Sequence, residues 1–128
     1  MAGADRGVPH LPNPAPIDAY GNGGFRFAGM SHRGSLLCLP DGIWAWPVVN
    51  MANLDEAALA PILTRADALD FFLIGTGADP ALLPERLRAR FSDVGLSVDA
   101  MATGPAVRTY NILLAENRRA GAGLIAVQ

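Results

Sequence analysis

Phe71–Gly77 reads Phe-Phe-Leu-Ile-Gly-Thr-Gly, four large apolar residues that lead directly into a glycine-containing turn. An unbroken apolar run of this length is typical of a strand buried on both faces, in the middle of a sheet that helices cover. The glycines permit a sharp exit from the strand or a close approach of another backbone. We therefore expect this strand at the centre of an α/β domain, and its exit is the first place to look for a small ligand.

Two helices and two further strands are predicted after this strand. In chain order they are a helix from Pro84 that Gly95 ends, a strand over 96–101, a helix over 103–119 and a strand over 124–127. Thr103 is expected to be the N-cap of the longer helix, and Gly121 and Gly123 are expected to break the chain after it. This part of the chain thus reads strand–helix–strand–helix–strand, with right-handed crossovers.

Four short β-type runs precede the central strand and read as an antiparallel meander. They cover 17–20, 25–28, 31–39 and 43–46, with turns at 21–24, 29–30 and 40–42. Gly34 is expected to mark a bulge in the third run. The period then becomes helical. Asn53 or Asp55 can cap a helix that runs to about Arg65, and Pro61 inside it predicts a short, late-starting or bent helix.

The length of 128 residues, about half of them apolar, fits one domain with a proper core. We expect the domain to span 17–128 and residues 1–16 to form a disordered tail, because this stretch is rich in proline and lacks the apolar segment of a signal peptide. A net charge of −2 argues against nucleic-acid binding. No apolar run approaches the ~18 residues of a membrane span. A single cysteine, Cys38, cannot form an internal disulfide, so the cytoplasm fits best.

Several chemistries are excluded by residue type or spacing. All ten basic residues are arginine, which rules out Schiff-base chemistry, a phosphate-binding loop lysine and a Ser–Lys dyad. Ser31 and His32 are adjacent on a predicted strand and would face opposite sides, so they do not form a hydrolase pair. His10 lies in the predicted tail, and the remaining histidine and cysteine, His32 and Cys38, lack metal-ligand spacing. We therefore expect neither a metal nor a cofactor.

The fourth run carries two tryptophans, Trp44 and Trp46, on one face of the strand. Either they cover the edge of the core or they anchor a partner protein. The core interpretation is favoured because an indole buries so much area. Cys38 is expected to be a small core residue on the preceding run.

The Gly75–Gly77 turn begins like a dinucleotide-binding fingerprint. Pro80 takes the place of the third glycine, and the helix starts too late for its N-terminus to meet a pyrophosphate. Asp99 does lie at the spacing of a ribose-binding acid. A tight turn after a buried strand is the favoured interpretation, and nucleotide binding is the alternative.

Polar residues gather in the longer helix at Arg108–Asn111. Asn111 shares a helical stripe with Val107, so its amide is expected to face the sheet and to bind backbone groups there, with a polar pocket floor as the alternative. Arg108 is placed to reach an anion held at Thr103, or to pair with a carboxylate such as Asp99.

Three segments together carry a family resemblance: Tyr20–Phe25 (Tyr-Gly-Asn-Gly-Gly-Phe), Phe72–Gly77, and Ala106–Leu113 followed by Glu116 and Arg118. In this order they resemble a small family of unknown function that includes mitochondrial complex I assembly factor 3 and archaeal and bacterial single-domain relatives. The resemblance covers nearly the whole chain after the tail. It implies a compact layered α/β domain without established enzymatic activity, and an assembly role as one option.

The predicted architecture is a layered single α/β domain, in which an N-terminal antiparallel β-meander joins a mixed central sheet built with the βαβαβ segment. The favoured function is that of a non-enzymatic protein-interaction or assembly-factor-like domain. We expect a monomer or weak homodimer that binds another protein, for example a subunit of a respiratory complex. The alternative is a binding protein or enzyme for an anionic small molecule. Its candidate ligand-binding residues are Gly75, Thr76, Gly77, Thr103, Arg108 and Asn111.

Overall fold

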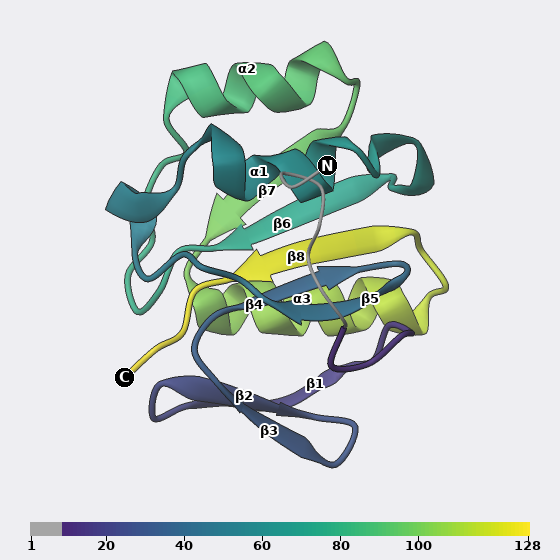
Figure 1. The fold of residues 1–128 in the computed structure, drawn as a ribbon, viewed down its shortest axis with the longest axis vertical. Helices are drawn as coiled ribbons and strands as arrows, with labels where there is room; N and C mark the ends of the chain where they lie inside the picture. The colour runs from purple at the N-terminus through teal and green to yellow at the C-terminus, as the bar shows by residue number, and fades with distance from the viewer. Residues whose placement is uncertain (1–8) are drawn as a thin grey trace.

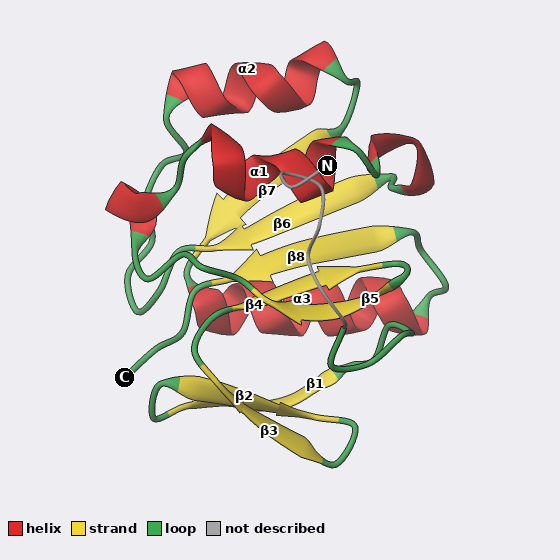
Figure 2. Cartoon of the chain, in the orientation of Figure 1, coloured by secondary structure: helices red, strands yellow, loops and turns green. Residues whose placement is uncertain are grey.

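The computed structural model describes residues 9–128, and its centre is a mixed five-stranded sheet (Figures 1 and 2). In spatial order its strands are β5 (Gly42–Ala45), β4 (Leu36–Leu39), β8 (Ala120–Leu124), β6 (Phe71–Gly75) and β7 (Ser97–Met101). β6 pairs in parallel with both β7 and β8, and β4 is antiparallel to β8 and to β5. Phe72, Leu73 and Ile74 are fully buried, which confirms the prediction of a central strand covered on both faces.

A second, three-stranded antiparallel sheet is formed by β1 (Ile17–Gly21), β2 (Gly24–Phe27) and β3 (Met30–Arg33). It lies below the central sheet in Figure 1. The predicted α/β architecture, a meander joined to a mixed sheet, is therefore confirmed. The meander itself is shorter than expected, because the run 31–39 is not one bulged strand. Gly34 has a φ of +97°, a left-handed conformation that suits glycine, and it separates β3 from β4, which belong to different sheets.

Helices cover both faces of the central sheet, and alternate residues of the strands feed two cores. On one face, Leu37, Phe72 and Ile74 pack with residues of α1 (Glu56–Leu63) and α2 (Glu85–Asp93). On the other face, Cys38 and Leu73 pack with α3 (Thr103–Ala115) and with the inner side of the β1–β3 sheet. This two-faced burial is the physical reason for the continuous apolar runs in the sequence.

The capping residues in the sequence predicted the start of α1 correctly, and the predicted starts of α2 and α3 are each off by one residue. Asp55 is the N-cap of α1, where its carboxylate accepts from the backbone N–H of Ala58 at 2.9 Å, and Pro61 lies inside this short helix. Pro84 is the N-cap of α2, not its first residue. Thr103 was expected to cap α3 but is its first residue, because its hydroxyl is engaged elsewhere, and Ala102 takes the cap position.

The last strand differs most from expectation. α3 ends at Ala115 and not near residue 119, and β8 covers Ala120–Leu124 and not 124–127. Gly121 and Gly123, predicted to break the chain, lie inside this buried strand. They are glycines because neighbours approach closely: a Cβ on Gly123 would lie 2.6 Å from the Trp46 ring.

Both tryptophans belong to the core, since Trp44 and Trp46 are 5% and 4% exposed, and the core interpretation is confirmed. Cys38 is also buried on its strand, as predicted. Of the predicted tail, residues 1–8 lie outside the described residues. Leu11 forms a β-bridge with Ile43 at the edge of β5, and the proposed domain boundary at residue 17 stays a prediction.

Candidate functional site

The carboxyl ends of β6, β7 and β8 meet at one edge of the central sheet, where open α/β sheets commonly bind ligands (Figure 1). The structure brings four of the predicted site residues to this edge: Gly75, Thr76 and Gly77 follow β6, and Thr103 begins α3. All four are buried. These four residues thus lie together, and their role as a ligand site stays a prediction.

The hydrogen-bonding groups at this edge are already used within the chain. Thr103 Oγ1 accepts from the Gly77 N–H at 2.9 Å and donates to the Ile125 carbonyl at 2.7 Å. The Thr103 N–H donates to the Gly77 carbonyl at 2.9 Å. Thr103 thus joins the segments after β6 and β8 to the start of α3, and its hydroxyl is satisfied by the protein.

Thr76 and the two glycines have structural roles of the same kind. The Thr76 hydroxyl donates to the Asp79 carbonyl at 2.6 Å and closes the turn after β6. A Cβ on Gly75 would lie 2.9 Å from Thr103 Oγ1, so only glycine fits beside this hydroxyl. Gly77 has a φ of +105°, a conformation that other residues rarely adopt. The edge is packed and internally bonded.

Asn111 does not join this group, because α3 runs away from the edge and Asn111 lies roughly 12 Å further along the helix axis. The Arg108 side chain reaches back toward the start of α3, where its Nη1 lies near Gly104. The Asn111 amide exchanges two hydrogen bonds with Ile17: its Oδ1 accepts from the Ile17 N–H and its Nδ2 donates to the Ile17 carbonyl, both at 2.8 Å. Asn111 therefore binds backbone, as predicted, but at β1 and not at the strand ends. Arg108 is exposed.

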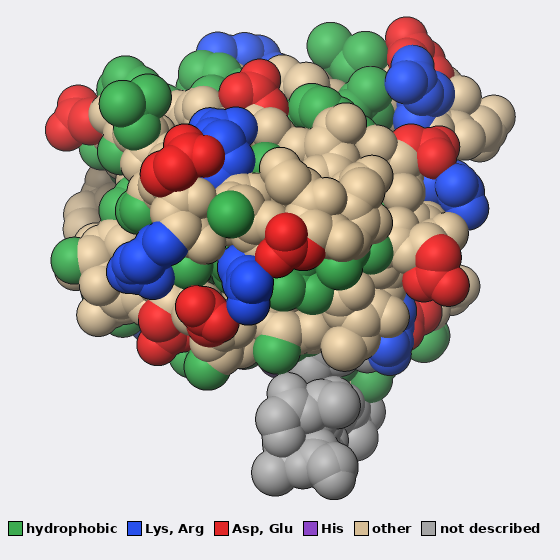
Figure 3. Space-filling model, turned by 90° about the horizontal axis from the view of Figure 1, so that it is seen from above, with side chains coloured by type: hydrophobic (Ala, Val, Ile, Leu, Met, Phe, Trp, Pro, Cys, Tyr) green, Lys and Arg blue, Asp and Glu red, His purple; other side chains and the backbone are tan. Residues whose placement is uncertain are grey.

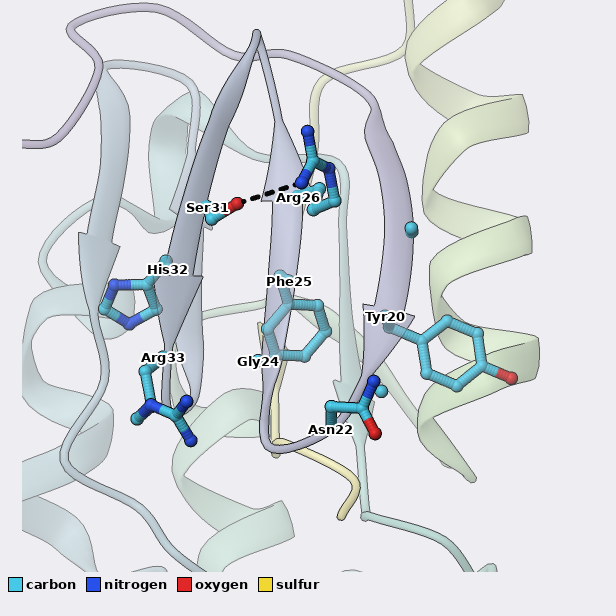
Figure 4. A pocket seen from close by; sticks show the side chains of 10 residues that line it. Tyr20, Asn22, Gly24, Phe25, Arg26, Ser31, His32 and Arg33 are labelled. Atoms are coloured by element: carbon cyan, nitrogen blue, oxygen red, sulfur yellow. Dashed lines mark hydrogen bonds between the residues drawn. The ribbon is translucent and has the colours of Figure 1, made fainter.

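A cleft that the sequence did not indicate lies on the β1–β3 sheet (Figure 4). Its volume is about 420 Å³. Arg26, Ser31 and Arg33 contribute side chains from the face opposite to the buried Phe25 and Phe27, because successive residues of a strand alternate between faces.

Two-residue turns and small side chains shape this cleft. The β1–β2 turn has Asn22 and Gly23 at positive φ, and Gly21 pairs with Gly24 beside it. Ala19 and the two glycines carry little or no side chain into the cleft, the glycines at its end beside the turn. A Cβ on Gly24 would collide with the His32 carbonyl, so the strands come together here only with glycine. The Tyr20–Phe25 segment, interpreted as a turn signal, forms the floor and end of the cleft.

The lining of the cleft carries basic side chains and, among the described residues, no acidic ones. Its ten lining residues include Arg26, Arg33 and His32 and contain no Asp or Glu. The Arg26 guanidinium donates to Ser31 Oγ at 3.3 Å, and neither Arg26 nor Arg33 forms an ion pair with the described residues. Unpaired guanidinium groups on an open face are donors for an acidic ligand.

His32 connects the cleft to the N-terminal segment. Its ring lies 4.7 Å from the His10 ring, and its Nε2 is 3.2 Å from the Ser35 carbonyl oxygen. Burial lowers the pKa of His32 below its ordinary value of 6.5, the neighbouring His10 lowers it further, and the Ser35 carbonyl opposes both. His32 is therefore neutral at pH 7, and the two arginines supply the charge of the cleft.

The cysteine and its aromatic neighbour offer no nucleophile. Cys38 is fully buried, and burial raises the pKa of its thiol to about 12, so it stays protonated at neutral pH. The Tyr110 hydroxyl is buried beside this thiol and makes no hydrogen bond of good geometry to any described residue; burial raises its pKa. Residues 9–128 also contain no group of three His, Cys, Asp or Glu side chains that could hold a metal ion.

The sequence matches a protein family and is similar to several known proteins. Residues 17–125 match the model of a family described as "Protein of unknown function (DUF498/DUF598)". An uncharacterized protein of Rhodobacter capsulatus is 39% identical over 117 residues, which are 91% of this chain and 89% of the relative. Assembly factor 3 of the NADH dehydrogenase [ubiquinone] 1 alpha subcomplex is 29% identical in Drosophila melanogaster and 28% identical in Danio rerio. Each match covers 85% of this chain, but only 57% and 63% of the length of the two factors.

Solved structures agree with the fold. A crystal structure named as an outer membrane protein of Bartonella henselae is 48% identical and has a TM-score of 0.89, covering 93% of this chain and 100% of that one. An NMR structure of a Rhodopseudomonas palustris protein is 50% identical with a TM-score of 0.83, covering 99% and 93%. Within the described part of this chain, none of the helices has the length and apolar character that crossing a bilayer requires.

Proposed function

Because the chain belongs to this DUF498/DUF598 family of proteins of unknown function, we propose that it acts as a non-enzymatic, assembly-factor-like domain that binds another protein. The relatives with a named role are assembly factors of NADH dehydrogenase. We propose a subunit of a respiratory complex as the partner and the cytoplasm as the compartment. Since this chain spans only part of those factors, their role is a guide to the class of function and not to the individual contacts.

One observation carries the proposal: the β1–β3 sheet has an open cleft whose lining includes arginines and no carboxylate, away from the internally bonded strand ends. An enzyme needs a nucleophile or an acid–base pair beside its substrate. The hydroxyls of Thr76 and Thr103 donate to backbone carbonyls, and the Cys38 thiol is buried and protonated. This arrangement favours recognition over catalysis.

The proposal is tested by capturing partners in the native organism. The tagged chain is expressed at its natural level, cross-linked and purified, and bound proteins are quantified by mass spectrometry against an untagged strain. We expect specific enrichment of one or a few respiratory-complex proteins, together with less assembled NADH dehydrogenase in a deletion strain. If no protein is enriched and the amount of assembled complex is unchanged, the assembly-factor proposal is wrong.

The alternative, an anionic small-molecule site at Gly75–Gly77 and the start of α3, is tested by measuring the melting temperature of the purified protein. A ligand that binds only the folded state raises the melting temperature by mass action. We expect phosphate and small carboxylates to shift the melting temperature no more than sodium chloride of equal ionic strength does. A saturable shift that Arg108→Gln removes would favour the small-molecule site instead.

A further inference from the structure

We propose that the cleft on the β1–β3 sheet binds an extended, acidic segment of a partner protein, through carboxylate contacts to Arg26 and Arg33. The inference rests on the proposed function, because it names the surface and the chemistry through which a partner is held. Four observations support it: the shape of the cleft, its charge, its aromatic and cationic border, and the charge of the rest of the chain.

The shape fits one extended chain. Adjacent strands lie about 4.8 Å apart, so a three-stranded face is roughly 10 Å wide, close to the width of a single polypeptide segment with its side chains. Ala19 on β1 and the Gly21–Gly24 pair beside the turn add little side-chain bulk to this face, and Arg26 and Arg33 lie along it (Figure 4). A backbone can therefore approach the sheet closely while its side chains reach the arginines.

The charges select carboxylates. β2 and β3 pair so that Arg26 lies opposite Ser31 and Gly24 lies opposite Arg33, which places the two arginines diagonally on one face. Diagonal neighbours across a strand pair are about 7–8 Å apart. Two carboxylates on alternate residues of an extended segment have a similar spacing, since each residue adds about 3.3 Å. A planar guanidinium binds a carboxylate through two parallel hydrogen bonds.

At the border of the cleft, Tyr20 pairs with Phe25 across β1 and β2, so its side chain leaves the sheet on the α3 side and not on the face of Arg26 and Arg33. Tyr20 lines the cleft and is 42% exposed, and Figure 4 shows its ring extending toward the helix. Tyr20 Oη and Arg108 Nη1 both lie against Gly104, where a Cβ would meet the tyrosine hydroxyl. Arg108 makes no ion pair with the described residues, and it lies beside Tyr20 on the α3 side, next to the cleft and not in its lining. Tyrosine and arginine are the residue types that most often dominate binding energy at interfaces.

The remaining surface argues for a short protein segment and against a polyanion. The chain as a whole carries a net charge of −2, and acidic and basic side chains are interspersed over α1 and α2 (Figure 3). A nucleic acid or an anionic bilayer would contact the acidic side chains of this mixed surface as well as the cleft, and those side chains would repel it. A single acidic segment lies within the cleft, where the lining has basic groups and no carboxylate.

The first experiment titrates the labelled protein with a probe peptide and follows its amide NMR spectrum. The probe is a blocked octapeptide of alternating Glu and Val, and the matched peptide has Gln in place of every Glu. We expect saturable shifts at β1–β3 amides with the Glu peptide and at least tenfold weaker binding with the Gln peptide. Equal binding of both peptides, or shifts centred on another surface, would overturn the proposal.

Matched variants assign the effect to the cleft. Arg26→Gln/Arg33→Gln removes two charges from the cleft, and Arg86→Gln/Arg88→Gln removes two charges from α2, on the other side of the central sheet. We expect the first variant to bind the Glu peptide at least tenfold more weakly and the second to bind it within about twofold of wild type, which general charge screening allows. An equal loss in both variants would show that net charge, not the cleft, binds the peptide.

Two further experiments distinguish a protein segment from other anionic ligands, and this inference from the proposed function. Short DNA and vesicles with anionic lipid are added in place of the peptide, and stronger cleft-dependent binding of either would overturn the choice of a protein segment. Partner capture is then repeated with both double variants. Partners lost only from the Arg26→Gln/Arg33→Gln variant support the inference, and partners retained by it overturn the inference while the proposed function stands. Peptide binding without any captured partner counts against the proposed function and leaves the cleft assignment intact.

Discussion

Replacing Asn111 by leucine tests the contact that joins α3 to β1 of the three-stranded sheet. The Asn111 amide is bonded to both backbone groups of Ile17, and Ile17 is only 2% exposed, so leucine leaves one buried donor and one buried acceptor without partners. Each hydrogen bond contributes about 0.5–1.5 kcal/mol net to the free energy of unfolding, and leaving a buried polar group without a partner lowers that free energy by at least as much. We expect the free energy of unfolding to fall by about 2 kcal/mol. For a chain of 128 residues, that loss lowers the melting temperature by about 7 °C.

Urea unfolding followed by circular dichroism measures the loss, and amide hydrogen exchange locates it. The Ile17 amide should exchange faster in Asn111→Leu, because its acceptor is gone. Asn111→Asp keeps the acceptor but loses the donor to the Ile17 carbonyl, so Ile17 should remain partly protected. Ile112→Ala serves as the control: this neighbour on α3 is 59% exposed, and its truncation should change stability by no more than about 0.5 kcal/mol.

The reasoning fails if Asn111→Leu is as stable as wild type and the Ile17 amide keeps its protection. That result would mean that the β1–β3 sheet is held by its apolar contacts alone. The role of Asn111 would then have to be sought in a ligand or a partner.

Three further outcomes follow from close contacts and buried groups. Gly123→Ala places a Cβ 2.6 Å from the Trp46 ring, so it should destabilise the fold by about 1–3 kcal/mol in urea titrations and shift tryptophan emission to the red. Tyr110→Phe removes a buried hydroxyl that makes no good hydrogen bond to the described residues, so the melting temperature should stay within about 3 °C of wild type or rise. Burial and His10 hold the pKa of His32 below 6.5, so the unfolded chain binds the proton first. Stability should therefore decrease as pH falls below about 6.5, and His32→Gln should flatten this dependence in unfolding experiments.

The sequence predicted the parts of the fold whose cause is local or is burial on both faces. The Phe71–Ile74 run identified β6 because a strand between two helical layers needs apolar residues at every position. Asp55 identified the start of α1 because an N-cap bond spans only three residues. The last strand was misplaced because the reason for Gly121 and Gly123 is not local. Glycine breaks a helix or a strand in isolation, and only the packed position of Trp46 shows why it belongs in β8.

For the candidate site, too, features with a local cause could be predicted and features that depend on distant residues could not. Gly75, Thr76, Gly77 and Thr103 lie together because β6 and β7 are parallel and end at a common edge, while their binding of a ligand stays a prediction. Their role could not be predicted, since the partner of the Thr103 hydroxyl is the Ile125 carbonyl, 22 residues away. For Asn111 the need for a backbone partner was clear from its position on the helix, but the partner, Ile17, lies 94 residues away.

The cleft was missed because of a small error in one turn and because charge pairing is a tertiary property. A two-residue turn at 29–30 would place Arg26 directly opposite Arg33, an arrangement that like charges disfavour. The turn instead uses Ala28 and Gly29, both at positive φ, so Arg26 pairs with Ser31 and the two arginines become diagonal neighbours. That register separates the charges enough to coexist and still directs both to one face. Whether a carboxylate neutralises them depends on how distant segments pack, and here none does among the cleft residues. A hairpin register can therefore turn two unremarkable arginines into a recognition surface.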